Sequence, residues 1–215
     1  YVEDALPIDE MKTVCSAVQR TTASRYINKE YADDNTALVA FDGNYWTVGI
    51  AAKQEVSITN IRTRKSRHAI AKVLSVVGQI ADKHALELEG MSIELGVLLP
   101  IDEMKGQEEL RLRLMELLYG FGYNGKQTGC LKVDAVHISP EGYGYAQLAQ
   151  KFPAIVLMFG HRDVACLYIN DGSISLSESR PLPGWGMVKL IYTIRYAFKD
   201  EFGAAEAIFN VGDVF

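Results

Sequence analysis

The sequence has 215 residues, with 22 Lys and Arg against 27 Asp and Glu, so its formal net charge is −5. This acidic balance argues against a generally basic nucleic-acid-binding protein. With 48% hydrophobic and 23% charged residues, the chain has the composition of a folded protein rather than of a disordered tail. At ~150 residues per domain, this length allows one large unit or two lobes, and two lobes is our working hypothesis.

The sequence carries no signal for a membrane or for secretion. No uninterrupted apolar run approaches the ~18 residues that cross a membrane, and the first residues lack the order of a signal peptide. Cys15, Cys130 and Cys166 are odd in number and show no paired metal-ligand spacing, which favours three reduced thiols. We therefore expect a soluble cytoplasmic protein, and because the chain begins with Tyr1, we consider it as part of a longer polypeptide.

The first third of the chain predicts a hairpin and a helix after a mixed segment. Residues 1–35 are interpreted as a helix or loop. Residues 37–42 and 45–50 flank Gly43-Asn44, which predicts a β-hairpin. Within 62–84, apolar residues recur every three or four positions, which predicts a helix with one buried stripe. The basic residues at its start are interpreted as a solvated face, with a contact to a phosphate or to a filament neighbour as the alternative.

The middle of the chain predicts alternating strands and helices. The apolar run 91–99 indicates a central strand covered on both faces, and the acids after Pro100 open a helix. Residues 121–123, the turn Asn124-Gly125 and residues 131–138 predict another hairpin or strand pair, and Pro140-Glu141-Gly142 leads into a short helix near 145–150.

The last third predicts a second lobe. Residues 154–159, 164–170 and 173–179 indicate three consecutive antiparallel strands, the first of them buried. Gly184-Trp185-Gly186 precedes a helix over 187–202. With Pro153 as the hinge, the predicted lobes are 1–152 and 153–215.

One heptapeptide, Leu-Pro-Ile-Asp-Glu-Met-Lys, occurs at 6–12 and again at 99–105. The flanking residues of the two copies do not match, so the identity is not evidence for a structural repeat. No function follows from it.

The most promising site is the strand and turn at 155–163. A glycine in such a turn, here Gly160, lets backbone N–H groups approach anionic oxygens because no Cβ blocks them. An ordinary hairpin corner is the alternative. No Ser/His/Asp order, Gly-x-Ser-x-Gly elbow or dinucleotide fingerprint appears, so covalent hydrolases and Rossmann dehydrogenases are poor candidates.

Several motifs in order, covering roughly residues 37–198, carry a resemblance to a known family. They are Trp46-Thr47-Val48-Gly49, Leu95-Gly96-Val97-Leu98-Leu99-Pro100, Ser139-Pro140-Glu141-Gly142-Tyr143-Gly144, Gly160-His161 and Gly186-Met187. Their succession resembles the ParM/StbA family of actin-like ATPases, and the plasmid-segregation type common in cyanobacteria is the most similar.

This resemblance implies an α/β actin-like (RNase H-like) ATPase fold of two lobes, incomplete at both ends. It implies ATP with Mg²⁺ between the lobes, and self-association into filaments that segregate plasmid DNA through a DNA-binding adaptor. The expected catalytic residue is Glu141, which would orient the attacking water. The expected nucleotide-binding residues are Gly160, His161 and Gly186, and no residue is assigned as a metal ligand. A capping role at the helix start is the alternative for Glu141.

The sequence departs from the family pattern where hydrolysis depends on it. Met158 replaces the leading acid of the second phosphate turn, Asp163-Val164 replace its Thr pair, and Ala165 replaces its closing Asp. Methionine cannot hold a metal-bound water by a charge-assisted hydrogen bond. The first phosphate hairpin has no match before residue 37. The alternative function is therefore a non-hydrolysing actin-like scaffold, and the enzymatic status stays open.

Overall fold

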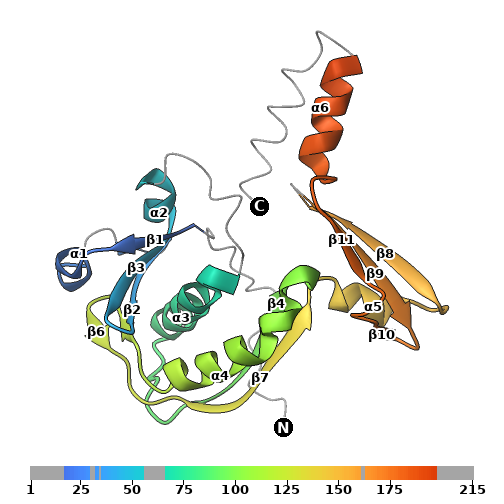
Figure 1. The fold of residues 1–215 in the computed structure, drawn as a ribbon. Coiled ribbons are helices and arrows are strands. Elements are labelled where there is room, and N and C mark those ends of the chain that lie inside the picture. Colours follow the sequence, from blue (N-terminus) through green and yellow to red (C-terminus); the bar gives the residue numbers. More distant parts are fainter. Residues whose placement is uncertain (1–16, 30–31, 34, 56–65, 161–162, 198–215) are drawn as a thin grey trace.

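The computed structural model describes residues 17–29, 32–33, 35–55, 66–160 and 163–197. Figure 1 shows β1 to β7 with α1 to α4 gathered in one part, and β8 to β11 in a second sheet beside it, with α6 projecting from that sheet. The elements in chain order are β1 (Val18–Thr21), α1 (Ala23–Ile27), β2 (Thr36–Phe41), β3 (Asn44–Gly49), α2 (Ile50–Glu55), α3 (Ser66–Lys83), β4 (Ser92–Leu99), η2 (Ile101–Gly106), α4 (Gln107–Leu118), β5 (Gly122–Tyr123), β6 (Lys126–Gln127), β7 (Lys132–Pro140), α5 (Tyr143–Leu148), β8 (Ala154–Phe159), β9 (Val164–Asn170), β10 (Ser173–Ile174), β11 (Arg180–Leu182) and α6 (Met187–Ala197).

The first sheet is antiparallel, with the strand order β1-β3-β2-β5-β6. Asp42 and Gly43 join β2 to β3 with φ values of 52° and 67°, as a tight two-residue hairpin turn requires. The predicted hairpin is confirmed, with its turn one residue earlier than expected. Strand β1 was missed, because four residues between polar segments give too short a pattern to distinguish a strand from a loop.

Strands β4 and β7 form a separate parallel pair, connected by η2 and α4. A parallel pair needs such a crossover. The prediction that 91–99 is covered on both faces is wrong, since alternate β4 side chains are exposed. On the exposed face of the pair, Glu94 and His137 lie 2.8 Å apart between Oε1 and Nε2.

The core of the first part lies between its two sheets. Helices α3 and α4 supply side chains that pack against both sheets, and the most buried members include Leu74, Leu114, Leu118 and Phe121, each at most 1% exposed. Burying each of these side chains contributes about 2 kcal/mol. The predicted helices over 62–84 and after Pro100 are confirmed within the described residues, because these apolar stripes fix which helix faces point inward.

The second copy of the heptapeptide forms the end of β4 and most of η2. Leu99 and Met104 from it are buried, and Glu103 Oε2 accepts a hydrogen bond of 2.7 Å from the backbone N–H of Ser66, the first residue of α3. A carboxylate at a helix N-terminus is stabilised by the exposed N–H groups there. This copy therefore has a structural role, whereas the copy at 6–12 lies outside the described residues.

The second sheet has β9 at its centre, with β8 on one side and β10 and β11 on the other, all antiparallel to β9. The predicted run of antiparallel strands is confirmed, but 173–179 contributes only Ser173–Ile174. The prediction of a buried first strand is wrong, because β8 alternates half-buried and exposed side chains. The division into lobes at residue 153 stays a hypothesis. Residues 62–65 and 198–202 of the predicted helices lie outside the described residues.

A close contact joins α3 to β5. The ring of Tyr123 lies on Gly78, so that a Cβ at position 78 would come within 2.6 Å of its Cγ. We expect Gly78→Ala to lower the free energy of unfolding by about 2 kcal/mol, because the added methyl overpacks this contact. Urea denaturation measures the loss. Gly96→Ala is the control, since a Cβ there meets nothing within 4 Å, and equal effects of the two substitutions would contradict the prediction.

The phenol of Tyr123 makes stability depend on alkaline pH. Burial raises the pKa of Tyr123 above its usual value of 10, and Asp82 raises it further by charge repulsion and a hydrogen bond. A raised folded-state pKa contributes stability that is complete below pH 10 and is lost as the pH rises above it. We expect Tyr123→Phe to flatten this fall, as followed by urea titrations in alkaline buffers. An equally steep fall in both proteins would disprove the assignment.

Candidate functional site

The candidate site begins where the parallel strands β4 and β7 end. The backbone N–H of Glu141 donates to the carbonyl oxygen of Leu99 at 2.7 Å, so Glu141 lies directly at the carboxyl ends of both strands. Open α/β sheets bind ligands at this edge. Helix α5 starts at Tyr143 with Gly142 as its N-cap, which places Glu141 one residue before the cap. The half-buried Glu141 is thus outside the helix that the capping alternative invoked.

Gly142 connects this edge to the second sheet. Its φ of +90° lies in the left-handed region, and a Cβ at this position would overlap Met158 Sδ and Leu167 Cδ1. Only glycine combines this backbone conformation with such a close approach. The segment after Glu141 therefore packs directly on β8 and β9. Its contact on β8 is Met158, which lies two residues before Gly160.

Two turns at the end of the second sheet are tied together by two hydrogen bonds, and a third closes the turn between Gly160 and Asp163. The Gly160 N–H donates to the Asp163 carbonyl oxygen at 2.9 Å, and the Met187 N–H donates to the Gly160 carbonyl oxygen at 2.9 Å. The Asp163 carboxylate accepts from the Gly184 N–H at 2.8 Å. This network brings Gly160 beside Gly186, the buried residue before α6.

Three of the four expected site residues can be placed. Gly160 and Gly186 share one network, and Glu141 is joined to it through the contact of Gly142 with Met158. The fourth, His161, lies outside the described residues. Sequence reasoning missed the link from Asp163 to Gly184. Gly184 has a φ of +75°, and a glycine at the end of a strand was the available signal for a tight turn.

The residues that depart from the family pattern serve packing. Met158 on β8 is the register partner of Ala165 on β9, so the two lie on the same face of the sheet. That face carries Met158 toward Gly142 at the start of α5. The position expected to hold a carboxylate is therefore part of an apolar contact between α5 and the sheet.

Within the described ranges, no group of three or more His, Cys, Asp and Glu side chains could hold a metal ion. None of the helices in that part of the chain is long and apolar enough to span a membrane.

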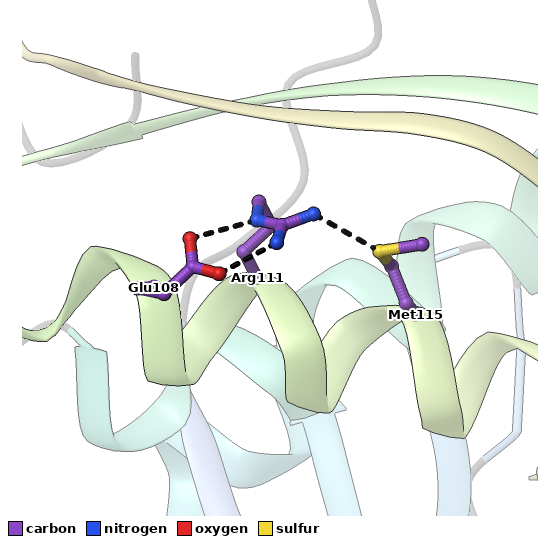
Figure 2. A network of polar contacts seen from close by, with 3 residues as sticks. All are labelled: Glu108, Arg111 and Met115. Carbon is purple, nitrogen blue, oxygen red and sulfur yellow. Dashed lines mark hydrogen bonds and ion pairs between the residues drawn. The ribbon is translucent and has the colours of Figure 1, made fainter.

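A separate cavity of about 450 Å³ opens at the other end of β7. It is lined by Met115, Tyr119, Cys130, Leu131, Lys132 and Val133. Figure 2 shows Arg111, which is held by both carboxylate oxygens of Glu108 at 2.6 and 2.8 Å and donates at 3.4 Å to the Sδ of Met115, one of the lining residues. Lys132 begins β7 and Pro140 ends it, so this cavity is not part of the site at Glu141.

No family model and no curated protein matches the sequence. Solved structures do match. An AlfA filament bound to AMPPNP aligns with a TM-score of 0.60 at 17% identity, over 86% of this chain and 66% of that one. The actin-like protein Alp7A gives 0.56 at 15% identity, over 86% and 57%, and the apo pSK41 ParM protein gives 0.53 at 14% identity, over 93% and 71%.

These alignments confirm the expected fold. The chain has an α/β actin-like fold, shared with proteins whose sequences it barely resembles. It spans 66% of the AlfA subunit and 57% of Alp7A.

A substitution at Gly142 tests how the β4–β7 pair is joined to the second sheet. We expect Gly142→Ala to cost about 3 kcal/mol of unfolding free energy, from a left-handed backbone without glycine and from overpacking against β8 and β9. Thermal and urea denaturation measure it. Gly144→Ala is the matched control on the same helix, because a Cβ there meets nothing within 4 Å. A Gly142→Ala protein as stable as the control would show that this contact does not hold the sheets together.

Proposed function

We propose that the chain is the nucleotide-binding part of an actin-like protein that assembles into filaments. The observation that carries this is the meeting of three elements: the end of β7 at Glu141, the turn from Gly160 to Asp163, and the start of α6 at Gly186 and Met187. Glycine-containing turns beside a helix N-terminus are suited to phosphate oxygens. ATP with Mg²⁺ is the proposed ligand.

Each expected site residue has a physical role in this proposal. The Gly160 N–H is already used by the Asp163 carbonyl oxygen, so Gly160 would contribute room for a phosphate rather than a donor. Gly186 would do the same at the start of α6, an 11-residue helix with no acid in its first turn. Such a helix favours an anion at its N-terminus. His161 is proposed beside them from the resemblance alone.

Glu141 is proposed as the residue that orients the attacking water. It follows the last residue of β7, and its backbone is fixed by the hydrogen bond to Leu99. A carboxylate held in this way can accept a proton or hold a water beside a phosphate. ATP would supply the reactive phosphoryl group when bound, and the chain supplies position and charge.

A second candidate function is a scaffold that binds nucleotide without hydrolysing it. Two observations favour it. Met158 packs on Gly142 instead of presenting a charge, and the Asp163 carboxylate already accepts the Gly184 N–H. Both functions share the nucleotide site and differ only in turnover.

Self-association is part of the proposal for both functions. The structure with the TM-score of 0.60 is itself a filament with AMPPNP bound, which supports the same behaviour here. With a net charge of −5, contact with DNA is assigned to an adaptor protein rather than to this chain. A cytoplasmic location is proposed because the three cysteines show no paired spacing, which favours reduced thiols.

The decisive experiment compares ATP turnover with ATP binding. We expect Glu141→Gln to lower the ATPase rate by about 100-fold or more, the usual contribution of a positioned acid or base, while the ATP-dependent rise in melting temperature is kept. Glu94→Gln is the control, since Glu94 pairs with His137 on an exposed face. Light scattering with and without ATP reports filament growth.

The outcomes separate the candidates. Turnover that is lost only in Glu141→Gln supports the enzyme. An ATP-dependent thermal shift without turnover in the unchanged protein supports the scaffold. No thermal shift with ATP would overturn the nucleotide site itself.

A further inference from the structure

An exposed tryptophan lies between the two turns of the candidate site. Trp185 is 63% exposed, although tryptophan side chains are highly buried on average. On one side of it along the chain, the Gly184 N–H donates to the Asp163 carboxylate at 2.8 Å. On the other side, the Met187 N–H donates to the Gly160 carbonyl oxygen at 2.9 Å. The backbone of Trp185 is therefore held from both sides at the turn that follows β8.

A positive charge lies against the indole ring. The Nζ of Lys189, in the first turn of α6, is 4.7 Å from the ring centroid of Trp185. A cation over the face of a tryptophan is attracted by the π electrons of the ring. This contact orients a side chain that would otherwise rotate freely in solvent. Both side chains are exposed, so the ring and the ammonium group are accessible to a ligand.

An aromatic surface next to a positive charge matches the two chemical parts of a nucleotide. Every nucleobase has a π face that stacks on an aromatic side chain. The phosphates are anionic and are attracted to a lysine ammonium group. A phosphate chain without a base would use the charge alone, whereas a nucleoside triphosphate would use the charge and the ring. The pair of Trp185 and Lys189 therefore favours a ligand that carries a base.

We propose that Trp185 stacks on the base of the bound nucleotide and that Lys189 positions its indole ring. This inference rests on the proposed nucleotide site, and it adds the residue that distinguishes a nucleotide from a bare phosphate chain. The stacked ring holds the base, while the phosphates lie toward Gly160 and Gly186 on the adjoining turns. Lys189 is a positioning residue because it acts on the base through the ring.

Calorimetry with Mg²⁺ present, comparing ATP with tripolyphosphate, tests this proposal on the full chain. Tripolyphosphate supplies the phosphates without a base. We expect Trp185→Ala to weaken ATP binding about 10-fold, the usual effect of removing a stacked aromatic ring, and to leave tripolyphosphate binding unchanged. Trp185→Phe keeps an aromatic face and should stay within about 3-fold of the unchanged protein. Tyr145→Ala is the matched control, because Tyr145 on α5 is also 63% exposed.

Tryptophan fluorescence adds a readout that a merely structural role would not change. The chain has two tryptophans, and the other one, Trp46, stacks on Phe41 with the ring centroids 5.9 Å apart. We expect ATP, but not tripolyphosphate, to quench the emission of the exposed Trp185, and Trp185→Phe to abolish this quenching. Lys189→Met should reduce the quenching, and Lys189→Arg should restore it because arginine also places a cation over the ring.

The outcomes separate this inference from the proposed function. If Trp185→Ala weakens the binding of ATP and tripolyphosphate equally, or of neither, the stacking role is overturned and the nucleotide site remains. The same follows if Trp185→Phe loses as much ATP affinity as Trp185→Ala. If Trp185→Ala does not fold, the unchanged chain decides, since ATP binding without quenching overturns the inference. No ATP binding to the unchanged chain overturns both proposals. Trp185 emission that shifts with protein concentration instead of with ATP identifies a second copy as the ring's contact and overturns the inference.

Discussion

The arrangement of the candidate site depends on one contact, the approach of Gly142 to Met158 and Leu167. The first part of the chain ends its parallel pair at Pro140, and the second sheet begins with β8 only fourteen residues later, at Ala154. Because Gly142 has no side chain of its own, the side chains of Met158 and Leu167 reach its backbone, and this contact links the carboxyl end of β7 to β8 and β9. Glu141 and the turn at Gly160 are therefore linked through the contact of Gly142 with Met158.

The same contact explains the residues that differ from the family pattern. A carboxylate at position 158 would be directed into the contact with Gly142 and Leu167, where burying an unpaired charge is costly. Methionine adapts to an irregular apolar space, and Ala165 beside it leaves room. Asp163 meanwhile joins the turn after β8 to the turn before α6.

The sequence predicted those elements whose patterns are local. Asp42-Gly43 and Asn124-Gly125 specify turns by their backbone preferences, and the periodic stripes of α3 and α4 identify helices facing a core. The sequence could not predict which faces of β4 and β8 are covered, because an apolar run has the same composition whether the strand packs on one face or on both. Of the site, the glycine turns were visible in the sequence. The hydrogen bond between Gly184 and the Asp163 carboxylate was not visible in the sequence, since it joins residues 21 positions apart.

The exposed side chains of β8 follow from the same reasoning. Val156 and Met158 alternate inward and are half-buried, with Met158 in contact with Gly142 at the cap of α5, while Ile155, Leu157 and Phe159 alternate outward and are exposed. A strand whose sequence is apolar on both sides is selected for burial on both sides. The inward half of that burial positions the candidate phosphate turn.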